Sequence, residues 1–274
     1  MATTVDEPLT PPPGPNVGFT SSWPVRAADI DPDTRVRLDG IARYLEDIAW
    51  ENLQASMLPG TDPIWIVRRT VIDAVRPINW PDRVHLRRWC AGLSTRWTAM
   101  RVRMESSRGG LIESEGFWIN ISESTGMPTR ISDEGLAYLQ TMTDEHRLKW
   151  RRWLGEDAPP ESGADLHFPL RATDIDQFNH VNNAAYWQAV EQYLVDYPSL
   201  VAQPFRAVIE YNAPIFAGED VMVRGRLDPG VDDTESDQAQ PALRLWFMVG
   251  ESVRTAVSIG PMPEAAGPGG DSPS

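Results

Sequence analysis

The sequence predicts an α+β fold in which one domain occurs twice, and two repeated blocks carry this prediction. Pro24–Asp31 reads PVRAADID and Pro169–Asp176 reads PLRATDID, with six of the eight positions identical. A second pair of blocks recurs in the same order: Pro77-Ile78 with Asp82-Arg83-Val84, and Pro214-Ile215 with Glu219-Asp220-Val221. Because both blocks keep their order, we infer duplication of a whole domain of about 100 to 130 residues.

Each copy opens with a helix. From Leu38, apolar residues recur at Ile41, Leu45 and Ile48, the spacing of one helical face, and the turn signal Pro59-Gly60 follows. In the second copy we expect the helix to start near Asn182-Asn183, because an asparagine side chain accepts a hydrogen bond from a free N–H of the first turn.

Strands follow each helix. Alternating or β-branched runs predict them at Trp65–Val75, Val84–Cys90, Ala99–Glu105 and Leu111–Ile121, then at Arg206–Tyr211, Val221–Leu227, Leu243–Gly250 and Val253–Ile259. Gly109-Gly110 indicates a hairpin between two of them. A helix followed by successive strands is typical of antiparallel α+β domains, and the chain has neither β-α-β alternation nor a glycine-rich phosphate loop.

These patterns divide the chain into five parts. We expect a first half over residues 18–140, a linker over residues 141–165 and a second half over residues 166–260. Residues 1–17 and 261–274 read as disordered tails because they are rich in proline or glycine and lack apolar periodicity. Leu136–Trp153 is compatible with a helix, and the acidic insert Asp228–Pro241 is expected to be a mobile loop.

Composition narrows the function. The net charge of −14 argues against general nucleic-acid binding, and no apolar run is long enough for a membrane span. Cys90 is the single cysteine, and neither a secretory signal nor a metal motif is present, so we expect a cytoplasmic protein with no metal and no cofactor. Ten arginines between Arg68 and Arg108 are interpreted either as a docking surface for an acidic partner or as strand residues facing water.

The chemistry is expected at the start of the second helix. Asp174, Asp176 and His180 lie in the loop that enters this helix, where free N–H groups and the positive end of the helix dipole attract anions. A carboxylate, an imidazole and several amide donors in one loop are suited to acyl chemistry.

The motif DxDxxxHVNNxxY before a helix, duplicated in degenerate form, resembles the acyl-[acyl carrier protein] thioesterases of plants and bacteria. Further matching segments are Trp65–Thr70, Asn79–Val84, Trp118–Asn120 and Ile209–Tyr211. The resemblance implies a double hotdog fold, in which each half is an antiparallel sheet wrapped around one long helix. It also implies hydrolysis of a fatty acyl thioester on acyl carrier protein (ACP) during fatty acid biosynthesis, by a monomer or homodimer.

The family's functional residues carry over in part. Asp176 and His180 occupy the positions of its catalytic Asp and His. The position of its catalytic Asn is Phe178 here, with Asn179 next to it. The Glu and Cys of the plant enzymes fall at Pro214 and Ile215.

We assign catalysis to Asp176 and His180, which match family positions, and to Asn179, which lies next to the position of the missing Asn. Asp176 would act as base or nucleophile, and His180 would hold the water or the substrate carbonyl. N–H groups at the helix start would receive the oxyanion. Asn179 or Asn182 would position the water.

Five further residues support the predicted site, each with an alternative. Asn182 and Asn183 either assist the chemistry or only cap the helix. Glu191, which pairs by position with Glu46, either belongs to the site or fixes a helix. Tyr186 and Trp187 either line the acyl pocket or pack in the core.

The first copy is expected to be structural, because Arg35 stands at the position of His180 and a permanent cation cannot act as a base. Two other functions remain open: a thioesterase that acts on acyl-CoA, and an acyl-binding protein of the same fold without turnover. The missing Asn and Glu of the family favour the last of these.

Overall fold

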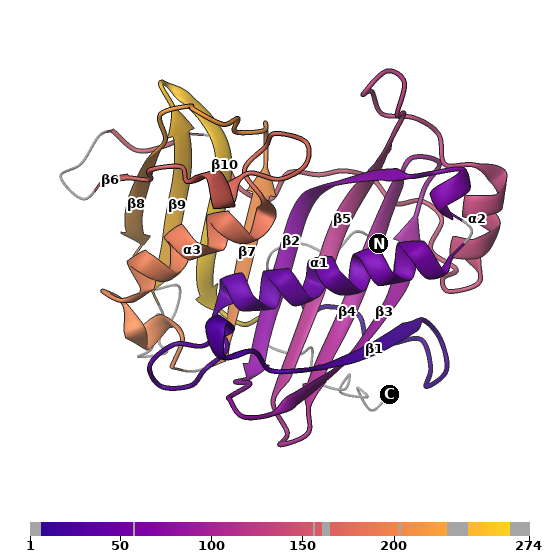
Figure 1. Cartoon of the computed structure of the whole chain (residues 1–274), viewed down its shortest axis with the longest axis horizontal. Helices are drawn as coiled ribbons and strands as arrows, with labels where there is room; N and C mark the ends of the chain where they lie inside the picture. The colour runs from indigo at the N-terminus through magenta and orange to yellow at the C-terminus, as the bar shows by residue number, and fades with distance from the viewer. Residues whose placement is uncertain are drawn as a thin grey trace, which may run out of the picture.

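The computed structural model of the chain describes residues 7–56, 58–155, 157–160, 165–202, 204–228 and 241–263. Ten strands form one sheet in the order β1-β3-β4-β5-β2-β7-β10-β9-β8-β6, and neighbouring strands of this sheet are antiparallel. The two longest helices, α1 and α3, lie on the same face of this sheet (Figure 1).

The first half contributes the side of the sheet nearer β1. Its elements are β1 (Phe19–Pro24), α1 (Leu38–Ala55), β2 (Ile64–Arg76), β3 (Arg83–Leu93), β4 (Trp97–Ser106), β5 (Leu111–Ile121) and α2 (Asp133–Gln140). The second half comprises β6 (Leu166–His167), α3 (Asn183–Leu194), β7 (Phe205–Tyr211), β8 (Met222–Asp228), β9 (Ala242–Val249) and β10 (Ser252–Pro261). All eight strands predicted from the sequence are present, and α1 and α3 begin where the caps and the apolar spacing place them.

One hydrophobic core joins the halves. The apolar stripe of α1, with Leu38, Ile41 and Ile48 fully buried, packs on the same core as Tyr186 and Trp187 of α3. Strand β9 shows the alternation that the sequence predicts, with Leu243, Leu245 and Phe247 on this helix-facing side and Trp246 and Met248 on the opposite side. Each half is thus an antiparallel sheet around one helix, which is the double hotdog fold.

The halves meet where β2 pairs with β7. Two buried ion pairs cross this seam on the face opposite the helices. Arg69 lies opposite Glu210 and donates to it from Nη1 at 3.1 Å. Asp73 lies opposite Arg206, which holds it through two hydrogen bonds of 2.6 and 2.7 Å.

The repeat extends to individual hydrogen bonds. In the first copy, Asp31 N–H donates to the Arg35 carbonyl at 2.9 Å; in the second, Asp176 N–H donates to the His180 carbonyl at 2.8 Å. The turn residues Thr34 and Asn179 both have positive φ, 68° and 62°. The two copies therefore fold into the same loop before their helices.

The connector differs from its prediction. Within Leu136–Trp153 the only helical residues are those of α2, and the chain then runs without regular structure. Glu210 explains the extended course, since its carboxylate accepts hydrogen bonds from Trp153 N–H at 3.0 Å and Leu154 N–H at 3.0 Å. Arg69 also stacks over the Trp153 ring at 3.6 Å. Because these backbone amides donate to Glu210 on the sheet, they are not available for the hydrogen bonds of a helix.

The predicted N-terminal tail is ordered in part. Arg206 donates to the Glu7 carbonyl at 2.7 Å and Arg87 to the Gly14 carbonyl at 2.8 Å, while Arg101 contacts the Thr10 carbonyl. The prediction of disorder is therefore wrong for residues 7–17, because arginines of the sheet bind their carbonyls. Residues 1–6, most of the acidic insert (229–240) and residues 264–274 lie outside the described residues.

The arginine-rich stretch is not a uniformly solvated surface. Arg69 and Arg101 are buried, and Arg88 lines a cavity. No helix in the described part of the chain has both the length and the apolar character needed to cross a membrane.

Candidate active site

The site begins at the first turn of α3. Asn182 caps the helix, and its side-chain oxygen accepts a hydrogen bond from Ala184 N–H at 2.8 Å. Such a cap stabilises a helix by about 1 kcal/mol. It also fixes the direction in which the preceding loop, with Asp176 and His180, enters the helix.

Asp176 is held by its own loop and keeps one oxygen free. Its Oδ1 accepts hydrogen bonds from Phe178 N–H at 2.8 Å and from His180 N–H at 3.0 Å. No donor among the described residues contacts its Oδ2. Because the backbone fixes the carboxylate, the free Oδ2 is available to water or substrate without further ordering of the side chain.

Two cavities meet at Asp176, one of about 290 Å³ and one of about 480 Å³. The larger contains His180, Tyr186 and Tyr211, and the smaller extends along α1. Both are lined by the same six residues: Ile64, Trp65, Trp118, Asp176, Phe178 and Asn183. Phe178, which stands at the position of the family's Asn, is 51% exposed.

A second carboxylate reaches this site from the first half. Glu46 of α1 lines the smaller cavity with Asp176, and Asn182 Nδ2 lies 3.3 and 3.2 Å from its two carboxylate oxygens. Burial raises the pKa of Glu46 from 4.5 to about 7, and the nearby charges of Asp47 and Asp176 add to this, while the amides of Asn182 and Asn183 oppose it. A carboxyl with a pKa near neutrality can exchange protons at the working pH.

The sequence analysis missed Glu46 as a site residue. The signal was present, because Glu46 occupies the same repeat position as Glu191. What the sequence did not show is that α1 and α3 run antiparallel, so that each glutamate faces the helix start of the other half.

His180 lies at the wall of the larger cavity with Asp176. Its ring packs edge-on against Phe216, with 4.9 Å between centroids. In the described part of the chain its ring nitrogens have no hydrogen-bond partner. The imidazole is therefore positioned by aromatic packing, and its nitrogens remain open to a ligand.

The first backbone amide of α3 is also open. Asn183 N–H has no acceptor among the described residues, and Asn183 lines both cavities. At the matching position of the first half, Leu38 N–H donates to Glu191 at 2.6 Å. A free first-turn N–H at the positive end of the helix dipole is suited to an oxyanion.

The structure separates two predicted residues from the site. Asn179 is exposed and lines neither cavity; its positive φ of 62° shapes the turn, and its N–H donates to the Asp176 carbonyl at 3.0 Å. Its side chain is not brought together with Asp176 and His180.

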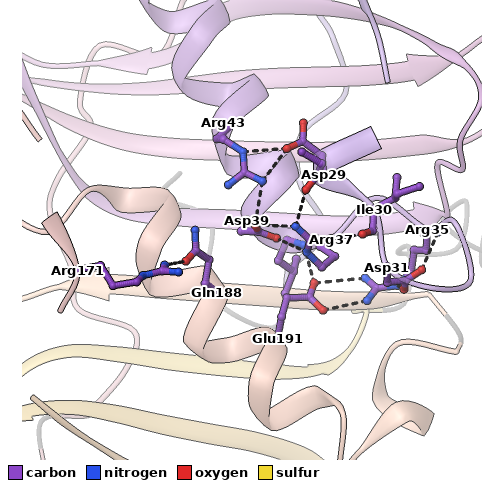
Figure 2. Close-up of polar contacts among 12 residues, drawn as sticks. Asp29, Ile30, Asp31, Arg35, Arg37, Asp39, Arg43, Arg171, Gln188 and Glu191 are labelled. Atoms are coloured by element: carbon purple, nitrogen blue, oxygen red, sulfur yellow. Dashed lines mark hydrogen bonds and ion pairs between the residues drawn. The ribbon is translucent and has the colours of Figure 1, made fainter. Parts of the chain in front are cut away.

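Glu191 is the second predicted residue that lies outside the site. It pairs with Arg35 at 3.0 Å and caps α1 through Leu38 N–H, which is the helix-fixing alternative (Figure 2). Arg35 also binds Asp31 through Nε at 2.9 Å, so one guanidinium pairs with Asp31 of the first-half loop and with Glu191 of α3.

The two predicted pocket residues differ. Tyr186 lines the larger cavity and packs against Tyr211 and Phe247 at 5.4 and 5.2 Å between centroids. Trp187 is 1% exposed and belongs mainly to the core. Asp174 is buried, and its carboxylate binds Arg171, which assigns it to the support of the loop. Among the described residues, no three His, Cys, Asp or Glu side chains are arranged to hold a metal ion.

Comparisons with known proteins agree on one family. The family model for the acyl-ACP thioesterase N-terminal domain matches residues 16–139, and the model for the acyl-ACP thioesterase C-terminal domain matches residues 157–256. The uncharacterized protein Rv2001 of Mycobacterium tuberculosis is 43% identical over 255 residues, which cover 93% of this chain and 96% of that protein.

Two solved structures share the fold at low identity. The 12:0-ACP thioesterase from Umbellularia californica is 15% identical with a TM-score of 0.69, over 88% of this chain and 92% of that one. An acyl-ACP thioesterase from Bacteroides thetaiotaomicron is 15% identical with a TM-score of 0.67, over 88% and 96%.

Proposed function

The chain belongs to the acyl-ACP thioesterase family and is a thioester hydrolase. From this premise we propose that its substrate is fatty acyl-ACP and that Asp176 and Glu46 are its two catalytic carboxylates. The observation that supports this assignment is that carboxylates from the two halves line one cavity at the free N-terminus of α3.

The proposed reaction uses the free Oδ2 of Asp176 as the base. A water molecule attacks the thioester carbonyl carbon and gives its proton to Asp176. The carbonyl oxygen becomes an oxyanion, which Asn183 N–H receives; such a donor contributes about 3 kcal/mol to the transition state. His180 lies on the same wall and holds the carbonyl or the water through a ring nitrogen.

Glu46 completes the step. With its pKa at about 7, a large fraction of Glu46 is protonated near neutral pH. Collapse of the intermediate breaks the carbon–sulfur bond, and Glu46 gives its proton to the departing thiolate. The products are the free fatty acid and the thiol of the carrier, and Asp176 returns the remaining proton to Glu46 through solvent.

Single-turnover hydrolysis of acyl-ACP tests these roles, with folding checked by circular dichroism. We expect Asp176→Asn, Glu46→Gln and His180→Ala each to slow the chemical step by about 100-fold or more. Asp31→Asn and Glu191→Gln, the matching changes at the start of α1, are expected to stay within a few-fold of the unmodified protein. If the Glu46 and Glu191 variants behave alike, Glu46 has no chemical role.

The preference for the carrier is measured with the same assay. We expect acyl-ACP to be hydrolysed faster than acyl-CoA of the same chain length, as the family implies. Faster hydrolysis of acyl-CoA would favour that carrier instead, and binding of acyl chains without release of thiol would favour the non-catalytic alternative.

A further inference from the structure

Arg88 is a cation inside the smaller cavity. It lies on β3 on the helix-facing side, like Val84 and Leu86, which are buried in the core. Its Nη1 donates to Asn52 Oδ1 at 2.6 Å, and Asn52 Nδ2 donates to the Tyr138 hydroxyl at 3.1 Å. These three side chains form a polar cluster, here called the Arg88 cluster.

The guanidinium of Arg88 has no carboxylate partner among the described residues. The buried arginines elsewhere in the sheet do have one: Arg69 pairs with Glu210 at 3.1 Å and Arg101 with Glu113 at 3.4 Å. Burial lowers the pKa of Arg88 to about 10, so the side chain stays charged at neutral pH. Arg88 is half-buried at the cavity wall, and a charge shielded from water is costly unless it is paired, so this guanidinium is suited to an acidic ligand.

The Arg88 cluster lies at a defined distance from the chemistry. Glu46 and Asn52 are six residues apart on α1, which corresponds to roughly 9 Å along the helix. Both line the same cavity, and the wall is otherwise mostly apolar, including Ala49, Leu53, Leu58, Trp65, Met100 and Trp118. The cavity therefore has a polar group of residues at the thioester, an apolar stretch, and a second polar group that carries a positive charge.

We propose that the acyl group of the substrate carries an oxygen acceptor, a carboxylate foremost, that binds the Arg88 cluster when the thioester carbon lies at Asp176 and Glu46. The inference deepens the proposed function and rests on it. A plain hydrocarbon chain in this cavity would cover the guanidinium without pairing it, whereas a carboxylate would accept from Arg88 and a hydroxyl or oxo group would also match Asn52 and Tyr138.

The test compares acyl-ACP substrates of equal chain length that end in a methyl, a hydroxyl or a carboxylate group. We expect kcat/KM to be highest for an oxygen-bearing chain, and Arg88→Met to lower it by about 10- to 100-fold, the range for a hydrogen bond to a charged group. On the methyl-ended chain, Arg88→Met is expected to raise kcat/KM, a reversal that a general loss of structure does not produce. A preference for the carboxylate-ended chain would show that the charge of Arg88 recognises the substrate. A preference for the hydroxyl-ended chain alone would show that hydrogen bonds of the Arg88 cluster do so.

Arg87→Met is the matched control, because Arg87 is the next residue of the same strand and donates to the carbonyls of Gly14 and Pro15 outside the cavity. It is expected to leave the order of substrates unchanged. A preference of the unmodified protein for methyl-ended chains at every length would overturn the inference, as would an Arg88→Met variant that folds and keeps the original substrate ratios.

Binding measurements separate this inference from the proposed function. Asp176→Asn is titrated with a free dicarboxylic acid and with the monocarboxylic acid of equal length. Tighter binding of the diacid, lost in Asp176→Asn/Arg88→Met, supports the inference even if no acyl-ACP is hydrolysed. Equal binding of the two acids overturns it, even where hydrolysis of plain acyl-ACP upholds the proposed function.

Discussion

The two halves carry the same loop before their helices, but one guanidinium makes them differ in chemistry. In the first half, both oxygens of Asp31 accept from Arg35, at 2.9 Å from its backbone N–H and 2.9 Å from its Nε. In the second half, Asp176 makes the equivalent backbone contact, with His180 N–H at 3.0 Å, and keeps Oδ2 open. The same loop conformation can therefore carry either an ion-pair cluster or a candidate active site, depending on whether Arg35 or His180 occupies this position.

The glutamates show the same contrast. Glu191 is bound by Arg35 and by Leu38 N–H, whereas Glu46 meets only amide donors and has a raised pKa. Full neutralisation stabilises an ionised carboxylate, and incomplete neutralisation leaves a carboxyl that can exchange a proton near pH 7.

The largest expected difference between the halves is at the aspartates. Asp176→Asn removes the proposed base and should lower the rate of the chemical step by about 1,000-fold, within the range for a positioned acid–base group. Asp31→Asn loses an ion pair only and should stay within a few-fold. Single-turnover hydrolysis of acyl-ACP measures both rates. A greater loss in Asp31→Asn would show that the site lies in the first half and that its assignment to Asp176 is wrong.

The glutamates should differ in pH dependence as well as in rate. Glu46 donates a proton in the proposed step, so activity should fall as pH rises above about 7, where Glu46 loses that proton. Glu46→Gln should be about 100-fold slower and should lack this limb of the profile. Glu191→Gln should keep the limb. Profiles of kcat from pH 5 to 9 provide the comparison, and a limb that survives in Glu46→Gln belongs to another group.

Removing the guanidinium should destabilise the first half without opening a second active site. Arg35→Ala leaves Asp31 and Glu191 half-buried without their cation, which we expect to lower the free energy of unfolding by about 2 kcal/mol, less than for a fully buried pair. Urea denaturation measures the loss. Turnover that Arg35→Ala restores to the Asp176→Asn protein would show that the first-half loop can catalyse.

The smallest expected effect is at the helix cap. Asn182→Ala should lower the free energy of unfolding by about 1 kcal/mol through loss of the cap. It also removes the amide that favours ionised Glu46, so the pKa of Glu46 should rise and the alkaline limb of the rate profile should move to higher pH. Arg37→Ala removes the matching residue of the first half, which makes no side-chain cap, and should leave that limb in place.

The sequence predicted most of the fold because the information was local. The repeat of PVRAADID gave the two loops, the spacing from Leu38 gave α1, and alternation gave the strands. It predicted Asp176 and His180 for the same reason, since both belong to one contiguous motif.

Two of the misses depend on contacts between distant segments, and the third depends on the conformation of a turn. The sequence of Leu136–Trp153 is compatible with a helix, but Glu210 of β7 binds the amides of Trp153 and Leu154 instead. Glu46 was overlooked because its partner Asn182 is 136 residues away. Asn179 was chosen for its residue type next to the missing Asn, whereas its positive φ shows that the turn required it.

The charges at the seam between the halves also favour one register of β2 against β7. Along β2, Arg69 precedes Asp73, and along β7, Arg206 precedes Glu210, so antiparallel pairing sets each charge against its opposite. A slip of four residues would keep every side chain on its correct face, and apolar patterning would therefore tolerate it. The charges would not, because one such slip sets Arg69 against Arg206 and the other sets Asp73 against Glu210. The charges of the two strands therefore disfavour both four-residue slips, and the register that they favour holds Glu46 over the start of α3.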